Sequence, residues 1–154
     1  MGKGYMIKKF KTFINLDFKT KLMFFRAFVL CGYYRFAMLF VPFSKLAIKM
    51  GELGLESSDL YDETLTPYII KVRRIVILAS RNTPWESLCM VQALTVQKFL
   101  NKKKIDSTIY FGLSKDENNN PIAHAWIKHG GKIVVGEKGM ERFAVVAKFG
   151  SVHQ

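Results

Sequence analysis

The longest apolar stretch, Leu22 to Val41, limits what this chain can fold into more than any other feature. Its 20 residues are enough to span a bilayer as a helix. Arg26 and Arg35 interrupt it nine positions apart, so at about 100° per residue they lie on opposite sides of that helix. Each arginine would cost about 2.5–3.5 kcal/mol near a membrane centre. We therefore expect a helix packed inside the protein or against a protein partner, in preference to one that contacts a membrane.

This expected helix is rich in aromatic side chains that can supply the packing. They are Phe24, Phe25, Phe28, Tyr34, Phe36 and Phe40. Pro42 ends the helix, and a second short helix is expected from Phe43 to Met50. A signal peptide is not expected, because the apolar stretch starts late, contains an arginine and lacks a small-residue cleavage site behind it.

The charge is strongly basic and unevenly distributed. The 154 residues hold 24 Lys and Arg against 12 acids, and residues 1–50 alone hold ten basic side chains against one acid. Such a balance attracts polyanions or an anionic membrane. No nucleic-acid-binding motif accompanies it, so we expect no nucleic-acid partner. Two cysteines are too few for a disulfide framework or a structural zinc site, which favours the reducing cytoplasm and predicts no metal and no cofactor.

We divide the chain into an amino-terminal helical region, residues 1–80, packed on a core formed by residues 81–154, as one compact unit. A turn-rich acidic connector, Gly51 to Pro67, separates the first helices from a helix expected at Tyr68–Arg81. One face of that helix is apolar at helical spacing. Its members are Ile69, Val72, Ile75, Val76 and Ala79.

The carboxy-terminal region begins with a helix whose start is ambiguous. Thr83-Pro84-Trp85-Glu86 has the pattern of a capping box, and Ser87 is a rival cap. Cys89 is the sixth helical residue if Thr83 caps and the second if Ser87 does. Only the second case lets first-turn amides and the helix dipole stabilise a thiolate. Cys89 also lies on an apolar face with Ala93, where a cysteine is usually a small buried side chain.

Three strands are expected after this helix, at Thr108–Leu113, Ile122–Lys128 and Lys132–Val135. Gly130-Gly131 between the last two is typical of a two-residue hairpin loop. That loop sets the pairing of the two strands. It pairs Ile127 with Val134, Trp126 with Val135 and His124 with Glu137, whereas a three-residue loop would place Gly136 opposite His124.

The order of Cys89, His124 and Glu137 is what a thiol nucleophile, its general base and the orienter of that base require. Imidazole suits the proton transfer near neutral pH. A single histidine in a strand is more often a structural residue, and the combination is what favours catalysis here. A metal site of Cys89, His124 and His129 is disfavoured, because the two histidines are five apart and point to opposite faces of a strand.

Three segments together resemble the leader-peptidase B proteins of lasso-peptide biosynthesis. They are Trp85-Glu86-Ser87-Leu88-Cys89-Met90-Val91-Gln92-Ala93-Leu94, Tyr110-Phe111-Gly112-Leu113 and Ala123-His124-Ala125-Trp126-Ile127. The resemblance covers residues 20 to about 145, and the family includes the carboxy-terminal domain of the microcin-processing protein. It implies an α+β fold with a transglutaminase-like (papain-like) cysteine peptidase core, a helix and an antiparallel sheet, preceded here by the apolar helical region.

The resemblance implies that Cys89 is the nucleophile and His124 the base. The family's third residue is an Asp about twelve positions after the His, where this chain has Gly136 followed by Glu137. Either Glu137 serves, or the orienter lies elsewhere, or a dyad works without one. The Cys89 amide is the expected oxyanion donor, and Trp85, Glu86 or Ser87 is expected close to it.

By the same resemblance, the expected function is removal of the leader from a ribosomally synthesised precursor peptide during lasso-peptide maturation. The expected partners are the precursor, a separate leader-recognition protein and the macrolactam-forming cyclase. Three alternatives remain. They are a non-catalytic peptide-binding subunit of the same complex, an enzyme that transfers the acyl group to an amine, and a membrane protein with a soluble tail.

Overall fold

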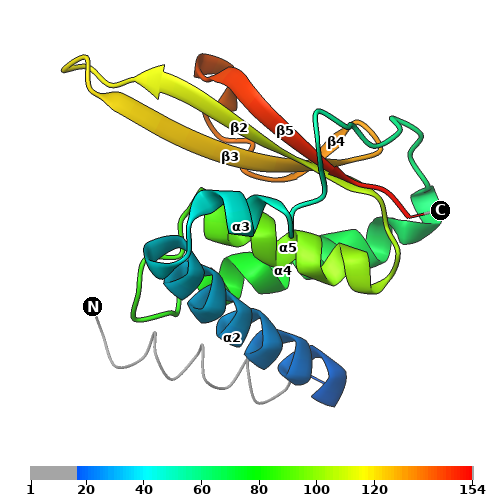
Figure 1. Ribbon diagram of the computed structural model, residues 1–154. Coiled ribbons are helices and arrows are strands. Elements are labelled where there is room, and N and C mark those ends of the chain that lie inside the picture. The colour runs from blue at the N-terminus through cyan, green and yellow to red at the C-terminus, as the bar shows by residue number, and fades with distance from the viewer. Residues whose placement is uncertain (1–16, 154) are drawn as a thin grey trace.

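A computed structural model describes residues 17–153 as one antiparallel sheet with helices on one side (Figure 1). The helices are α2 (Phe18–Phe40), α3 (Phe43–Ala47), α4 (Thr66–Ser80) and α5 (Cys89–Lys102), with 3-10 turns η1 (Glu63–Leu65) and η2 (Met140–Arg142). The strands are β1 (Glu52–Leu53), β2 (Ser107–Lys115), β3 (Pro121–His129), β4 (Lys132–Val135) and β5 (Ala144–Ser151). The sheet order is β1-β5-β2-β3-β4, and every neighbouring pair is antiparallel. The predicted α+β class is confirmed.

The core lies between the sheet and α5. Ile109 of β2, Ile127 of β3 and Leu100 of α5 are fully buried there. Alternate residues of a strand point to opposite faces, so the residues next to these two isoleucines point away from that core. The predicted apolar face of α4 is confirmed, because all five of its members are buried. Helix α2 packs against α4 and α5 on the side away from the sheet (Figure 1).

Helix α2 is buried on one side only. Its fully or nearly buried residues are small or turned inward, at positions Ala27, Cys31, Tyr34 and Ala37. The predicted aromatic packing is confirmed for Tyr34, Phe24 and Phe28, and it is wrong for Phe25, Phe36 and Phe40, which are exposed. Two neighbouring helices can cover only one side of a third. Among residues 17–153, α2 is the one helix long and apolar enough to cross a membrane, and 22% of its most apolar window is buried.

The two arginines of α2 reach different neighbours, as their opposite placement on the helix predicts. The guanidinium of Arg26 lies 5.5 Å from the centre of the Phe99 ring on α5. Arg35 forms an ion pair with Glu86, with 3.0 Å between Nη2 and Oε2. Both side chains therefore tie α2 to the α5 region and keep their charged ends near solvent.

The β3–β4 hairpin has the predicted two-residue loop. Gly130 and Gly131 have φ values of 52° and 72°, the left-handed conformation that such a loop requires at both positions. His129 pairs with Lys132, as this loop dictates. Next to the loop, the register is therefore the one that the sequence predicts.

A bulge then shifts this register by one residue. After Lys128 pairs with Ile133, the ladder is irregular and Ile127 pairs with Val135. An extra residue in one strand leaves two residues opposite one, and every later pair moves with it. The predicted pairs of Ile127 with Val134, of Trp126 with Val135 and of His124 with Glu137 are therefore wrong.

The face of the sheet away from the core carries a polar-aromatic cluster. The rings of Tyr110 and Trp126 stack with an interplanar angle of 2°, and both residues are buried. The Tyr110 hydroxyl donates a hydrogen bond to Glu56, which also pairs with Lys148 at 2.6 Å. Hydrogen bonds from Lys148 and Tyr110 lower the pKa of Glu56, whereas burial and this carboxylate raise the pKa of Tyr110.

Candidate active site

Helix α5 begins at Cys89. Leu88 precedes it in an extended conformation, and no side chain caps the helix. Both predicted caps are therefore wrong. The Thr83 hydroxyl lies 2.9 Å from the Trp85 carbonyl oxygen and 2.9 Å from the Ser87 hydroxyl, so these two side chains satisfy each other and the backbone of the preceding turn.

This start gives Cys89 the environment that the Ser87 alternative was expected to provide. The first amides of a helix have no partner within the helix, and together with the helix dipole they stabilise a nearby negative charge. The first turn of α5 contains no acidic residue to compete for them. The thiol is half-buried, whereas the other cysteine, Cys31, is fully buried. Partial exposure at a helix start is typical of reactive cysteines.

His124 is half-buried on β3, three residues before Ile127, where the pairing with β4 ends. Its Nε2 lies 2.7 Å from the carbonyl oxygen of Gly136. A carbonyl only accepts, so Nε2 carries the hydrogen and Nδ1 is the nitrogen able to accept a proton in the neutral ring. The rings of Phe143 and Trp126 lie 5.1 Å and 6.0 Å away and fix its plane.

Cys89 and His124 line one pocket of about 350 Å³. The other lining residues are Arg73, Ile77, Leu88, Gln92, Val135, Gly136, Glu137 and Lys138. Among the hydrogen bonds of residues 17–153, none joins the Cys89 sulfur to the His124 ring. Catalytic hydrogen bonds of enzymes without substrate are often long and tighten when substrate binds. The fold thus brings the predicted nucleophile and base to the same cavity.

Glu137 also lines this pocket, but it is not the hydrogen-bond partner of His124. The carbonyl of the preceding residue, Gly136, occupies that role. A Cβ at position 136 would lie 2.4 Å from the Ala125 carbonyl oxygen, and its φ of +86° disfavours side chains as well. The one-residue mismatch with the family pattern therefore coincides with a backbone acceptor, which no side-chain pattern could reveal.

The three residues expected near the oxyanion do not line the pocket. Trp85 packs edge-on against Phe28, with 5.3 Å between ring centres, and Glu86 pairs with Arg35. Ser87 is buried beside the preceding turn. These residues connect α2 to the start of α5, so their contacts hold the backbone just before Cys89 in place.

Gln92 is a pocket residue that sequence reasoning missed. It lies one turn after Cys89 on the same side of α5, and its Nε2 donates a hydrogen bond of 3.0 Å to the Ser87 carbonyl. A side-chain amide is a common donor to an oxyanion. Its position three residues after Cys89, on the same side of the helix, was the sequence signal that could have identified it.

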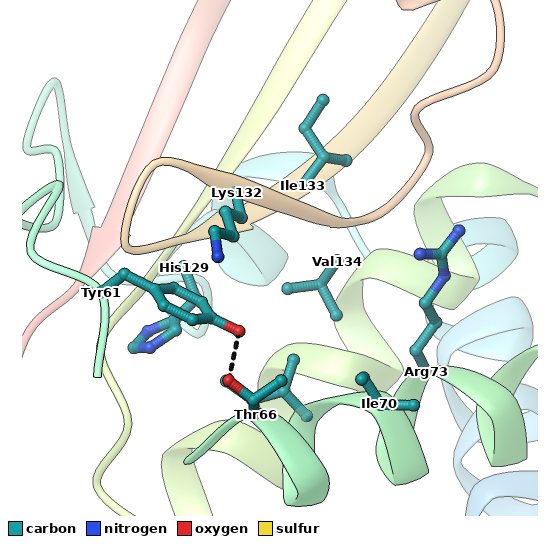
Figure 2. Close-up of a pocket in the computed structure, with 9 residues that line it drawn as sticks. Tyr61, Thr66, Ile70, Arg73, His129, Lys132, Ile133 and Val134 are labelled. Atoms are coloured by element: carbon teal, nitrogen blue, oxygen red, sulfur yellow. Dashed lines mark hydrogen bonds between the residues drawn. The ribbon is translucent and has the colours of Figure 1, made fainter. Parts of the chain in front are cut away.

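A second pocket of about 180 Å³ adjoins the first, because Arg73 lines both. Figure 2 shows Lys132 above the Tyr61 ring, with 3.6 Å from its Nζ to the ring centre, and the Tyr61 hydroxyl bonded to Thr66 at 2.7 Å. His129 belongs to this pocket, and its Nδ1 donates to the Asp106 carbonyl. The residues described hold no group of three metal-ligating side chains.

A helix that starts at a half-exposed cysteine, next to an antiparallel sheet that presents a histidine to the same pocket, is the arrangement of papain-like cysteine enzymes. Residues 34–148 match the model of the transglutaminase-like superfamily, and the chain belongs to this superfamily. The predicted transglutaminase-like fold is thereby confirmed. Comparisons with curated proteins and with solved structures gave no match. The superfamily includes cysteine peptidases and transglutaminases, and the narrower resemblance to lasso-peptide B proteins stays a prediction.

Proposed function

We propose that the protein is a cysteine peptidase that removes the leader from a ribosomally synthesised precursor during lasso-peptide maturation. The observation that carries the peptidase assignment is the shared pocket of Cys89, at the uncapped start of α5, and His124, held by the Gly136 carbonyl. The resemblance of the segments around these two residues supports the choice of substrate.

In the proposed mechanism, His124 Nδ1 takes the proton of the Cys89 thiol, and the thiolate attacks the scissile carbonyl carbon. Oxyanion charge then meets the Cys89 backbone amide and the Gln92 side-chain amide. His124 passes its proton to the leaving amine, which releases the core peptide and leaves a thioester. A water molecule that gives its proton to His124 attacks this thioester, freeing the leader as an acid and restoring the thiol.

The proposal includes a division of labour. The pocket of about 350 Å³ accommodates a few residues around the scissile bond, which is a small part of a leader peptide. A distinct leader-recognition protein would supply the affinity for the rest of the leader, and a macrolactam-forming cyclase would act on the released core peptide. These steps would occur in the cytoplasm, and the mechanism uses no metal and no cofactor.

A non-catalytic peptide-binding subunit is the second candidate. The observation that favours it is the absence, among residues 17–153, of a hydrogen bond from the Cys89 sulfur to the His124 ring. Under this alternative, Cys89 would react with alkylating reagents like an ordinary thiol at all pH values, with or without His124.

The test has two arms. First, the alkylation rate of Cys89 by iodoacetamide is measured across pH in a Cys31→Ala background, with and without His124→Ala. A thiolate that persists well below the ordinary thiol pKa of about 8.5, and is lost with the histidine, supports the dyad. Second, the candidate precursor and recognition protein are added. Cys89→Ala abolishes leader removal and Cys31→Ala retains it. Leader removal by folded Cys89→Ala would refute the assignment.

A further inference from the structure

The outward face of α2 carries a continuous apolar stripe. Leu22, Val29, Phe36 and Phe40 are 59%, 67%, 60% and 69% exposed. Steps of seven, seven and four residues keep them within about 40° around the helix axis. Apolar patches of this extent are rare on soluble monomers and mark surfaces that contact something. Among the elements of residues 17–153, Figure 1 shows α2 farthest from the sheet.

Basic side chains lie beside the amino-terminal end of this stripe. A cavity of about 310 Å³ beside α2 is lined by Lys19, Arg26, Lys102 and Lys103 over an apolar floor. That floor consists of Leu22, Met23, Tyr68 and Phe99. No acidic residue lines this cavity, so it combines a cationic rim with an apolar base.

A second cavity flanks the same end of α2. It measures about 400 Å³ and is lined by Lys71 and Arg74 of α4, Thr20 of α2 and apolar side chains, again without an acid. Helix α2 itself contains no acidic residue, since Asp17 precedes it as its cap. Thr20 lies about 160° around the helix axis from Leu22, so this second cavity is on another side of α2. The cations that border the stripe are therefore the four of the first cavity, which has no acid among its lining residues.

We propose that this face of α2 lies flat on an anionic membrane surface, with lipid headgroups against the four cations of the first cavity and the stripe in the headgroup–acyl boundary. Helices that bind in the membrane plane combine an apolar face with basic side chains in this way. The excess of ten basic side chains over one acid in residues 1–50 matches the charge of an anionic leaflet.

The packing of α2 favours this flat placement over a membrane-spanning one. Ala27 and Cys31 are fully buried against α4 and α5, so a spanning helix would have to leave that contact and uncover the core. A second copy of the chain is a poor occupant of the stripe. It would bring the same cations and no α2 acid to meet them, and like charges repel at such short range.

The inference is independent of the proposed peptidase activity. It is tested by flotation of the full chain with vesicles of phosphatidylcholine alone or with roughly one third phosphatidylglycerol. We expect binding to the anionic vesicles that falls steeply with added salt, as for surface electrostatic attraction. Val29→Glu and Phe36→Glu should each lower the bound-to-free ratio at least tenfold. The matched control is Val146→Glu, which makes the same charge change at an exposed valine of β5.

A second pair of variants tests the cavity. Lys102→Gln with Lys103→Gln should weaken anionic-vesicle binding, whereas Lys115→Gln with Lys138→Gln, of equal charge change, should weaken it much less. All these side chains are exposed, so circular dichroism should show unchanged folding.

Three results would overturn the proposal. The first is a chain that stays unbound with both vesicle types. The second is glutamate variants of the stripe that float as well as the control. The third is a dimer by light scattering that Val29→Glu dissociates while vesicle binding is absent, which would assign the stripe to self-association.

Discussion

Replacing Gly136 with alanine separates the backbone acceptor of His124 from every side-chain candidate. The new Cβ would lie 2.4 Å from the Ala125 carbonyl oxygen and 2.7 Å from Trp126 Cα, so the Gly136 peptide must move. The carbonyl oxygen that accepts from His124 Nε2 at 2.7 Å belongs to that same residue. We therefore expect one substitution to lower both stability and the function of the histidine.

The magnitude follows from two contributions. A left-handed conformation costs alanine about 1–2 kcal/mol, and forced crowding adds about 1–3 kcal/mol. Gly139 is the matched control, because its φ is also positive, at 76°, and nothing lies within 4 Å of its Cβ position. Gly139→Ala should therefore cost only the first contribution. Loss of a hydrogen bond to a charged imidazolium is worth about 1.5–3 kcal/mol, which would slow the proton transfer proposed for His124 about 10- to 150-fold.

The assay combines urea unfolding, for the free energy of unfolding, with native-state alkylation of Cys89 and, with the precursor in hand, the rate of leader removal. Gly136→Ala should approach His124→Ala in both rates, while Gly139→Ala stays near the unsubstituted protein. The reasoning is refuted if the two alanine variants are equally stable, or if Gly136→Ala is destabilised and its rates are unchanged.

Three further predictions concern the supports of the site. Gly32→Ala places a Cβ 2.9 Å from the Trp85 ring and should lower the free energy of unfolding by about 1–3 kcal/mol in urea titrations. Trp85→Phe removes a buried indole N–H that has no hydrogen-bond partner. Adding this change to Gly32→Ala should therefore restore part of the lost stability. Glu86→Ala removes an exposed ion pair with Arg35 and should change unfolding by less than about 1 kcal/mol. The pKa of Glu56 is lowered in the folded protein, so the ionised carboxylate stabilises the fold above the ordinary pKa of 4.5, and this stabilisation is lost as pH falls through the lowered pKa. Glu56→Gln should therefore have a lower urea midpoint than the parent protein at pH 7, and the two midpoints should converge in acid.

Features that depend on local periodicity were predictable from the sequence. The apolar face of α4, the positions of β2, β3 and β4 and the Gly130-Gly131 loop follow from spacing and turn chemistry, and the structure confirms each. The strands β1 and β5 were not predicted. The proximity of Cys89 and His124 followed from the order of helix and strands together with the resemblance. Each of these inferences needs only neighbouring residues or a known architecture.

Features that change when a helix start or a strand register shifts by a single residue were not predictable. Thr83 and Ser87 both suit a helix cap, yet they bond to each other and α5 starts uncapped at Cys89. The bulge between Ile127 and Lys128 has no sequence signal, and it shifts the register so that Glu137 is not opposite His124. The exposure of one side of α2 was not predictable, because hydropathy does not indicate which side of an apolar helix packs against neighbouring elements.

The use of the Gly136 carbonyl to hold His124 has a consequence for robustness. A carboxylate orienter takes up a proton in acid and can be deleted by a single side-chain change. A peptide carbonyl does neither, because it does not titrate and every residue type supplies one. The acceptor that orients the ring is thus the same at every pH at which the chain is folded, and the side chain at position 137 is not needed for that role. The residue type is restricted instead at position 136, where the crowded left-handed backbone accommodates glycine alone.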